Sequence, residues 1–359
     1  MAGSSSKIHG DSRSPSHKTE TEPKTVLCCP ECDGRLDLGQ TQAQCLECGR
    51  QWPALLGIPD FREREGSYIQ RDLEQAETLA AAFASNHRAE LVVMSVELGS
   101  FYQDEQASSN LRWQRIRNRQ QWQANSWGIA ARLDQLKSSI SFQHNDVAVD
   151  VGCGSGSHLP ALAERYRQVV GVDASLSELI LAKKLLEETG LTNVRLACAF
   201  AEQLPIMTQT VDFAMALYVL EHVMSASASL AEVYRIHKPG GHFYFAVPFR
   251  YTWVPPEPHT HVWWVGWLPR RWQAGYVQVF KPNFDFEKIH LFSFGEIAGL
   301  AARLGHNRLQ FFDPGFDHRF PPVRQKQRLW KFLSKSGLLL ALAKIFFRQS
   351  IHAIMTRLP

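Results

Sequence analysis

The feature that most constrains the fold is an alternation of short apolar runs and amphipathic stretches that starts near residue 146. Val147–Val151 and Val169–Val172 are predicted to be buried strands, and residues 157–167 and 176–189 are predicted to be helices. The same rhythm continues in strands at Val194–Ala197, Phe213–Ala216 and His242–Val247, with a helix at 226–236. Strands that alternate with helices are typical of a parallel, doubly wound α/β sheet.

Residues 249–292, the aromatic insert, interrupt this alternation with prolines, histidines, tryptophans and tyrosines. An insert at this place can fold over the carboxyl edge of the sheet and cover a substrate, since aromatic faces suit sugars, lipids, quinones or bases. An ordinary small hydrophobic core is the equally weighted alternative. Beyond the insert we predict a helix at 294–304, a strand at Leu309–Phe312, an apolar helix at 325–347 and a final strand at Ser350–Arg357.

A glycine-rich loop follows the first predicted strand of the sheet. It reads Asp150-Val151-Gly152-Cys153-Gly154-Ser155-Gly156 and leads into a helix. Glycines let the backbone turn sharply and approach a ligand, and the helix N-terminus offers free N–H groups to an anion. The dinucleotide fingerprint GxGxxG would need glycine at Ser157, so the loop favours a different nucleotide-like ligand.

Asp173 ends the second predicted strand, 23 residues after Asp150. A carboxylate at this place can accept hydrogen bonds from both hydroxyls of a ribose. The alternative is a structural role as a helix N-cap, because Ala174 and Ser175 lead into the next helix. Strand, spacing and glycine loop together favour the ribose.

Several motifs between residues 147 and 248 then occur in a fixed order. After the glycine loop come Gly171-Val172-Asp173, Ala201-Glu202-Gln203-Leu204-Pro205, Val211-Asp212-Phe213, Val219-Leu220-Glu221-His222-Val223 and Lys238-Pro239-Gly240-Gly241. With them this segment resembles the class I S-adenosylmethionine-dependent methyltransferases of the type-11 kind, which are related to ubiquinone-biosynthesis enzymes. The resemblance implies a Rossmann-like sheet, S-adenosylmethionine as cofactor and methyl transfer as reaction.

The resemblance also implies roles for single residues. It places the methionine part of the cofactor along the loop from Asp150 through Gly152, Gly154 and Gly156, and the ribose on Asp173. It places Ala201 and Glu202 beside the adenine and Leu217 near the methionine end. Many relatives carry an acidic residue where this chain has Phe200, on which the adenine could stack instead.

A second motif precedes this domain and consists of two cysteine pairs. Cys29 and Cys32 are separated by two residues, as are Cys45 and Cys48, and twelve residues lie between the pairs. Two such knuckles offer four thiolates in a tetrahedron, so we expect a structural zinc ion with no open coordination position. The segment is too short for a core of its own and needs the metal instead. With Gly57-Ile58-Pro59-Asp60-Phe61 it resembles the Trm112-type zinc ribbon.

Candidates for the chemistry are histidines and a glutamate. We select Glu221 and His222, which follow the fourth strand at the carboxyl edge, and His259 and His261 in the aromatic insert. Any of them could take a proton from the methyl acceptor or contact it. His222 could equally be a residue that only packs at a helix start. Relatives with the sequence Glu-x-x-Glu-His use a metal, but the first glutamate is missing here, so we do not expect a catalytic metal.

The predicted organisation has four parts: a disordered tail at 1–24, a zinc ribbon at 25–62, a helical region at 63–143, and a methyltransferase domain at 144–359. The formal net charge of +4 is too small to argue for nucleic acid by itself. We expect a cytoplasmic protein, because the first 25 residues lack the apolar run of a signal peptide. The apolar segment Leu338–Phe347 is either a buried helix or a peripheral membrane contact.

Three functions follow from these motifs. The first is O- or N-methylation of a small-molecule, sugar or lipid-linked acceptor. The second is methylation of an RNA base, favoured by the ribbon and by a basic segment containing Arg112, Arg115, Arg117 and Arg119. The third is a scaffold that binds S-adenosylmethionine without catalysis, suggested by Phe200.

Overall fold

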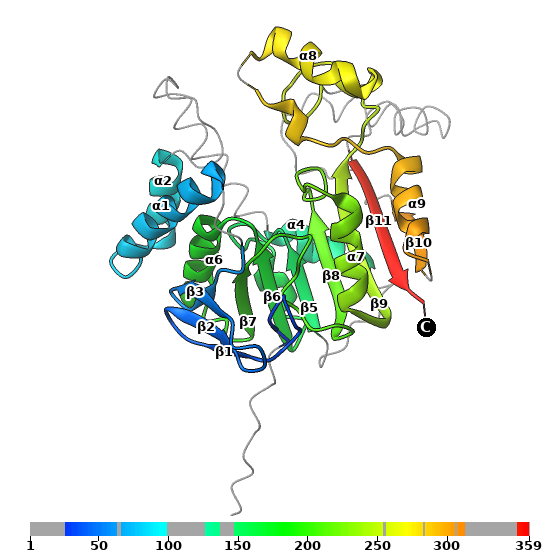
Figure 1. Cartoon of the computed structure of the whole chain (residues 1–359). Helices are drawn as coiled ribbons and strands as arrows, with labels where there is room; N and C mark the ends of the chain where they lie inside the picture. Colours follow the sequence, from blue (N-terminus) through cyan, green and yellow to red (C-terminus); the bar gives the residue numbers. More distant parts are fainter. Residues whose placement is uncertain are drawn as a thin grey trace, which may run out of the picture.

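The computed structural model describes residues 26–62, 66–98, 126–136, 147–253, 256–282, 284–305, 307–312 and 350–358 (Figure 1). The predicted tail at 1–24, the arginine-rich segment at 112–119 and the apolar segment at 325–347 lie outside these residues. Among the helices that are described, none has both the length and the hydropathy that a bilayer crossing needs.

Seven strands form one mixed sheet in the order β10-β11-β9-β8-β5-β6-β7. The strands are β5 (Val147–Val151), β6 (Gln168–Asp173), β7 (Val194–Cys198), β8 (Val211–Leu217), β9 (His237–Pro248), β10 (Asn307–Phe312) and β11 (Ser350–Arg357). Neighbours from β7 to β9 are parallel, whereas β11 is antiparallel to both β9 and β10. The predicted α/β class is confirmed. The direction of β11 was not predicted, because an apolar run identifies a strand but not its sense.

Helices cover both faces of this sheet (Figure 1). They include α5 (Leu159–Ala163), α6 (Leu176–Thr189), α7 (Ala226–Ile236) and α9 (Phe294–Arg303). Ser175 caps α6 by accepting a hydrogen bond from Glu178 N–H, and Gly190 ends that helix in a left-handed conformation. The bounds of α6 and α7 agree with the prediction. Helix α5 is shorter than the predicted 157–167, because the glycine loop and its turn extend to His158.

The core lies in two layers, one on each face of the sheet. Successive side chains of a strand point to opposite faces, so Val149 and Val151 pack in one layer and Ala148 in the other. The first layer also holds residues of α7 and α9, and the second holds residues of α5 and α6. The central strands are therefore buried on both sides, as expected for a parallel sheet.

The N-terminal residues form a separate antiparallel sheet, the ribbon. Its strands are β1 (Leu36–Leu38), β2 (Gln42–Cys45), β3 (Gln51–Leu55) and β4 (Ile58–Pro59). Directly after β4, Asp60 forms a parallel bridge with Cys198 at the end of β7, and Phe61 N–H donates to the Cys198 carbonyl at 2.8 Å. Cys28 N–H donates to the Pro205 carbonyl. The ribbon thus continues the hydrogen bonding of the large sheet at its β7 end, where an edge would otherwise be open.

The helical region contains α1 (Ser67–Ala82), α2 (Arg88–Glu97) and α4 (Ser126–Leu136). The apolar positions Ala76 and Leu79 of α1 are buried, and their spacing of three residues places them on one face of the helix. Asp72, on the same helix, accepts hydrogen bonds from Leu176 N–H and from the Ser175 hydroxyl, both at 2.8 Å. Helix α1 therefore supplies a carboxylate to the N-terminus of α6, where a negative charge is stabilised by the helix dipole.

Arg62 joins the ribbon to this helix. Its guanidinium contacts Asp60 at 2.9 Å and Asp72 at 2.7 Å, and it donates to the Ala174 carbonyl at 2.7 Å. The Arg62 side chain is fully buried. Such a charge is stable in the interior only when its partners surround it, so these contacts fix the ribbon, α1 and the loop after β6 relative to one another.

The aromatic insert includes η1 (Val265–Trp267), α8 (Arg270–Phe280) and η2 (Phe286–Lys288). Figure 1 shows it beyond the end of the sheet at which β8 and β9 finish. Val262, Val265, Val277, Phe286 and Leu291 form a small core of its own. Several tryptophans stay at its surface, namely Trp253, Trp263, Trp264, Trp267 and Trp272. The sequence left two interpretations of the insert open, a small hydrophobic core and an aromatic cover for a substrate. The insert has the core that the first requires and the exposed aromatic side chains that the second requires.

We predict that Arg62→Met lowers the free energy of unfolding by about 3–5 kcal/mol, because two carboxylates would stay buried without their cation. Urea denaturation followed by circular dichroism measures this. Arg71→Met on the exposed side of α1 is the matched control and should cost well under about 1 kcal/mol. An equal, small effect of both substitutions would contradict the structural role of Arg62.

Candidate functional site

The glycine loop turns back over the carboxyl ends of β5 and β6. Gly152, Gly154 and Gly156 all have positive φ angles, of 71°, 51° and 80°. A Cβ on Gly152 would lie 2.3 Å from Val219 Cγ2, whereas at Gly154 the same position meets nothing within 4 Å. The loop is thus packed against the protein at its start and open in its middle, as close approach of a ligand to the backbone requires.

Asp173, the last residue of β6, is held against this loop. Its carboxylate accepts hydrogen bonds from Gly154 N–H at 2.7 Å and from Ser175 N–H at 2.8 Å. Burial raises the pKa of Asp173 to about 6, against the lowering effect of these two N–H groups. The N-cap of α6 is Ser175, so capping does not account for Asp173. Each oxygen keeps a lone pair for a hydroxyl group.

Asp150 lies beneath the start of the loop and is almost fully buried. Neither of its carboxylate oxygens has a hydrogen-bond partner among the described residues, and His158 Nδ1 lies 3.6 Å from Asp150 Oδ2, an ion pair only when the histidine is protonated. A buried carboxylate without partners is costly. The arrangement therefore fits a ligand that combines an ammonium group with ribose hydroxyls, as S-adenosylmethionine does.

The other predicted cofactor positions lie at the same edge of the sheet. Ala201 is buried, and Glu202 accepts a hydrogen bond from Ser225 N–H at the start of α7. Leu217 ends β8 and is followed by Tyr218, whose φ of 59° turns the chain sharply. Parallel strands finish at one edge, so Asp150, Asp173 and these residues are brought there together.

Glu221, His222 and His259 come together beside this edge. Glu221 is fully buried, and burial raises its pKa to about 8. The rings of His222 and His259 meet edge to face with centroids 5.0 Å apart, and His222 Nε2 is 4.0 Å from Glu221 Oε1. Burial and the neighbouring His259 lower the pKa of His222 to about 4, so this ring is neutral at physiological pH.

His261 does not join these residues. It is exposed, and its N–H donates to the Glu257 carbonyl within the insert. Its φ of 57° belongs to the left-handed region, which turns the chain back after Thr260. Three of the four predicted catalytic candidates thus share one place, and the fourth lies outside it.

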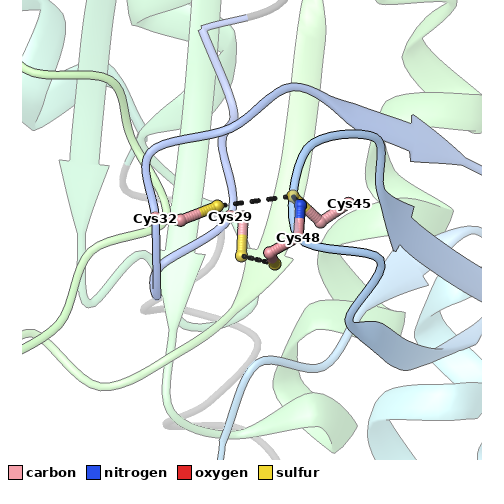
Figure 2. A group of neighbouring side chains, drawn as sticks. All are labelled: Cys29, Cys32, Cys45 and Cys48. Carbon is pink, nitrogen blue, oxygen red and sulfur yellow. Dashed lines mark hydrogen bonds between the residues drawn. The ribbon is translucent and has the colours of Figure 1, made fainter.

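The four predicted cysteines form one cluster (Figure 2). The Sγ atoms of Cys29 and Cys48 are 3.9 Å apart, and those of Cys32 and Cys45 are 3.5 Å apart. Four sulfurs about 2.3 Å from a tetrahedral zinc are about 3.8 Å from each other, so the cluster fits zinc and suggests a zinc site. The neighbouring Cys28 is not part of the cluster, because its thiol donates to the carboxylate of Asp33.

Sequence reasoning missed two positively charged residues near the site, one at the loop after β6 and one at the glycine loop. Arg62 is the first, and Arg88 is the second, because its guanidinium donates to the Ser155 carbonyl of the glycine loop at 3.1 Å. Both come from segments far upstream, and nothing in their local sequence distinguishes them from exposed charges. Only the docking of α1 and α2 against α6 brings them to the site.

Comparison with known proteins gives the class of the domain that is built around this edge of the sheet. Residues 149–245 match the family model described as "Methyltransferase domain". The chain is 30% identical over 114 residues to malonyl-[acyl-carrier protein] O-methyltransferase of Marinomonas sp., covering 32% of this chain and 42% of that protein. It is 35% identical over 118 residues to ubiquinone biosynthesis O-methyltransferase of Pseudomonas entomophila, covering 32% and 49%.

The chain spans about half the length of the curated relatives that it matches. A solved S-adenosylmethionine-dependent methyltransferase from Mesorhizobium loti is similar over 63% of this chain and 98% of its own, with 17% identity and a TM-score of 0.45. That likeness says nothing about the reaction. The ribbon and the aromatic insert lie outside the part matched by the family model.

We predict that Asp173→Ala weakens S-adenosylhomocysteine binding by about 1.5–3 kcal/mol, roughly 10- to 100-fold in Kd, through loss of two hydroxyl contacts to a charged acceptor. Since the pKa of Asp173 is about 6, wild-type affinity should also fall as the pH is lowered through that value. Calorimetry at several pH values measures both effects. Glu187→Ala, on the exposed face of α6, is the control; equal affinities of the two variants would refute the ribose assignment.

We predict that the four cysteines hold one zinc ion and that Cys45→Ser releases it. Because the ribbon bonds to Cys198 next to Asp173, zinc loss should also weaken S-adenosylhomocysteine binding. Cobalt substitution, with its sulfur-to-cobalt absorption, reports the site directly. The control variant Cys153→Ser, in the glycine loop, should keep the sulfur-to-cobalt absorption. The assignment would be contradicted if Cys153→Ser lost this absorption or if Cys45→Ser retained it.

Proposed function

We propose that this protein uses S-adenosylmethionine to methylate an oxygen or nitrogen of a small-molecule, sugar or lipid-linked acceptor. An open glycine loop, the carboxylate of Asp173 and the buried carboxylate of Asp150, which accepts no hydrogen bond from the described residues, converge at one edge of the sheet. This convergence is the observation that carries the proposal. These groups complement a backbone-contacting methionine chain, a ribose and an ammonium group.

In this proposal each part of the cofactor has a partner from the chain. Asp150 pairs with the ammonium group, Gly152, Gly154 and Gly156 allow close approach of the methionine chain, and Asp173 accepts the ribose hydroxyls. Ala201 and Glu202 lie on the adenine side, and Leu217 on the methionine side. The cofactor, when bound, supplies an electrophilic methyl group on sulfur.

The acceptor needs alignment with that methyl group more than it needs a strong base. His222 is about half exposed and unprotonated at physiological pH, so its lone pair can receive a hydrogen bond or a proton from an acceptor hydroxyl. Its lowered pKa makes it a weak base. We infer that His222 mainly orients the acceptor, which lowers the barrier by proximity.

The class of acceptor is inferred from the insert and from the relatives. Exposed tryptophans beyond the carboxyl edge suit flat, sugar-like or lipid-like groups. The relatives are named for malonyl-acyl carrier protein, demethylmenaquinone and ubiquinone biosynthesis. The ribbon, which motivated an RNA acceptor, bonds to the β7 edge and through Arg62 to α1, which supports a structural role for it.

Transfer of tritiated methyl groups to cell extracts, fractionated into RNA, protein, lipid and polar metabolites, tests this function. We expect label in the lipid or polar fraction and a fall of about 10²-fold in kcat for His222→Ala, with S-adenosylhomocysteine affinity unchanged. Lys288→Ala, an exposed position of the insert, serves as control. Label in RNA would favour the base methyltransferase, and cofactor binding without any transfer would favour the scaffold.

A further inference from the structure

Two histidines and a glutamate meet where the aromatic insert contacts the carboxyl edge of the sheet. Glu221 and His222 belong to the turn after β8, and His259 comes from the insert. One donor atom from each residue lies within 4.8 Å of the others. We propose that Glu221, His222 and His259 bind a first-row divalent metal ion such as zinc, distinct from the one suited to the four cysteines.

The side chain of Glu221 is the member of this group that a bound cation would stabilise most. It is fully buried, and neither oxygen has a hydrogen-bond partner among the described residues. An ionised carboxylate in this position would lose its hydration without a hydrogen bond from the described residues to replace it. A metal ion at its open side would supply the missing partner, with oxygen as a ligand that zinc and similar ions accept.

His259 is oriented as metal-binding histidines usually are. Its Nδ1 is hydrogen-bonded to the carboxylate of Glu257, which is itself buried and receives further bonds from the N–H groups of His259 and Thr260 and from the Thr260 hydroxyl. With Nδ1 donating, the lone pair is on Nε2. A carboxylate behind the ring fixes the tautomer and raises the basicity of the ligand nitrogen.

His222 completes the set from the more exposed side. Its ring packs edge to face on His259, and its Nε2 is 4.0 Å from Glu221 Oε1. Metal–ligand distances of about 2.0–2.2 Å require the three donors to approach each other by about 1 Å, within reach of small side-chain rotations. Three protein ligands leave at least one position open, unlike the closed cluster of four thiolates.

The third ligand explains why the sequence argued against a metal ion here. The motif Glu-x-x-Glu-His would have placed all ligands in one segment, whereas here His259 replaces the missing glutamate from the far side of β9. The ion would therefore tie the insert to the sheet. With the ion bound, the lone pair of His222 is directed to the metal, so His222 would orient an acceptor oxygen through the open position of the ion; this last step alone rests on the proposed function.

Metal titration of the full-length chain, with its cysteine site already loaded with zinc, tests the proposal. We expect cobalt(II) to bind one further equivalent by calorimetry, with visible absorption that lacks the sulfur-to-cobalt band. Glu221→Gln and His259→Ala should abolish this equivalent, and Glu257→Gln should weaken it about 10- to 100-fold. His290→Ala, a histidine at the same edge that is not among the three ligands, is the matched control and should bind normally.

Binding of S-adenosylhomocysteine to each variant shows that the variant is folded and that its cofactor site is intact. The metal site and the proposed function are therefore tested by separate measurements. If Glu221→Gln does not fold, the partly exposed His222→Ala takes its place. Absence of this cobalt equivalent in the wild type, or its persistence in His222→Ala and His259→Ala, would overturn the site. Loss of the equivalent with retained S-adenosylhomocysteine affinity would establish it.

Discussion

A buried guanidinium holds the parts of this chain together. Arg62 contacts Asp60 after the ribbon, Asp72 on α1 and the Ala174 carbonyl beside the candidate ribose carboxylate. Asp72 in turn bonds to the N-terminus of α6. Because an unpaired charge is costly in the interior, none of these elements can move away without leaving the others uncompensated. The position of the loop after β6, and with it Asp173, depends on residues of the N-terminal region.

The carboxyl edge of the sheet concentrates buried polar groups that have no hydrogen-bond partner among the described residues. Asp150 and Glu221 are both buried carboxylates without hydrogen bonds from described residues, one under the glycine loop and one under the insert. Proteins tolerate such groups mainly where a ligand or ion completes them. Their presence at one edge is the physical reason to treat that edge as the place for both cofactor and acceptor.

Local patterns predicted the strands and helices well where the pattern is complete. The spans of β5, α6, α7 and β11 agree with the sequence, since apolar period, Ser caps and Gly190 all act within a few residues. The cofactor loop and the cysteine cluster were also predictable, because their ligands are close in sequence. The direction of β11, the exposure of His261 and the roles of Arg62 and Arg88 were not, because each depends on contacts between distant segments.

The sequence by itself determined the α/β class, the glycine loop with Asp173, and the four cysteines that fit zinc, because each is written in the spacing of neighbouring residues. Only the tertiary structure decided which charges are buried and which segments share an edge. It brought His259 of the insert to Glu221 and His222, and it placed Asp60 against Cys198. Burial and electrostatic pairing arise when distant elements pack, and no local pattern encodes which partners they will meet.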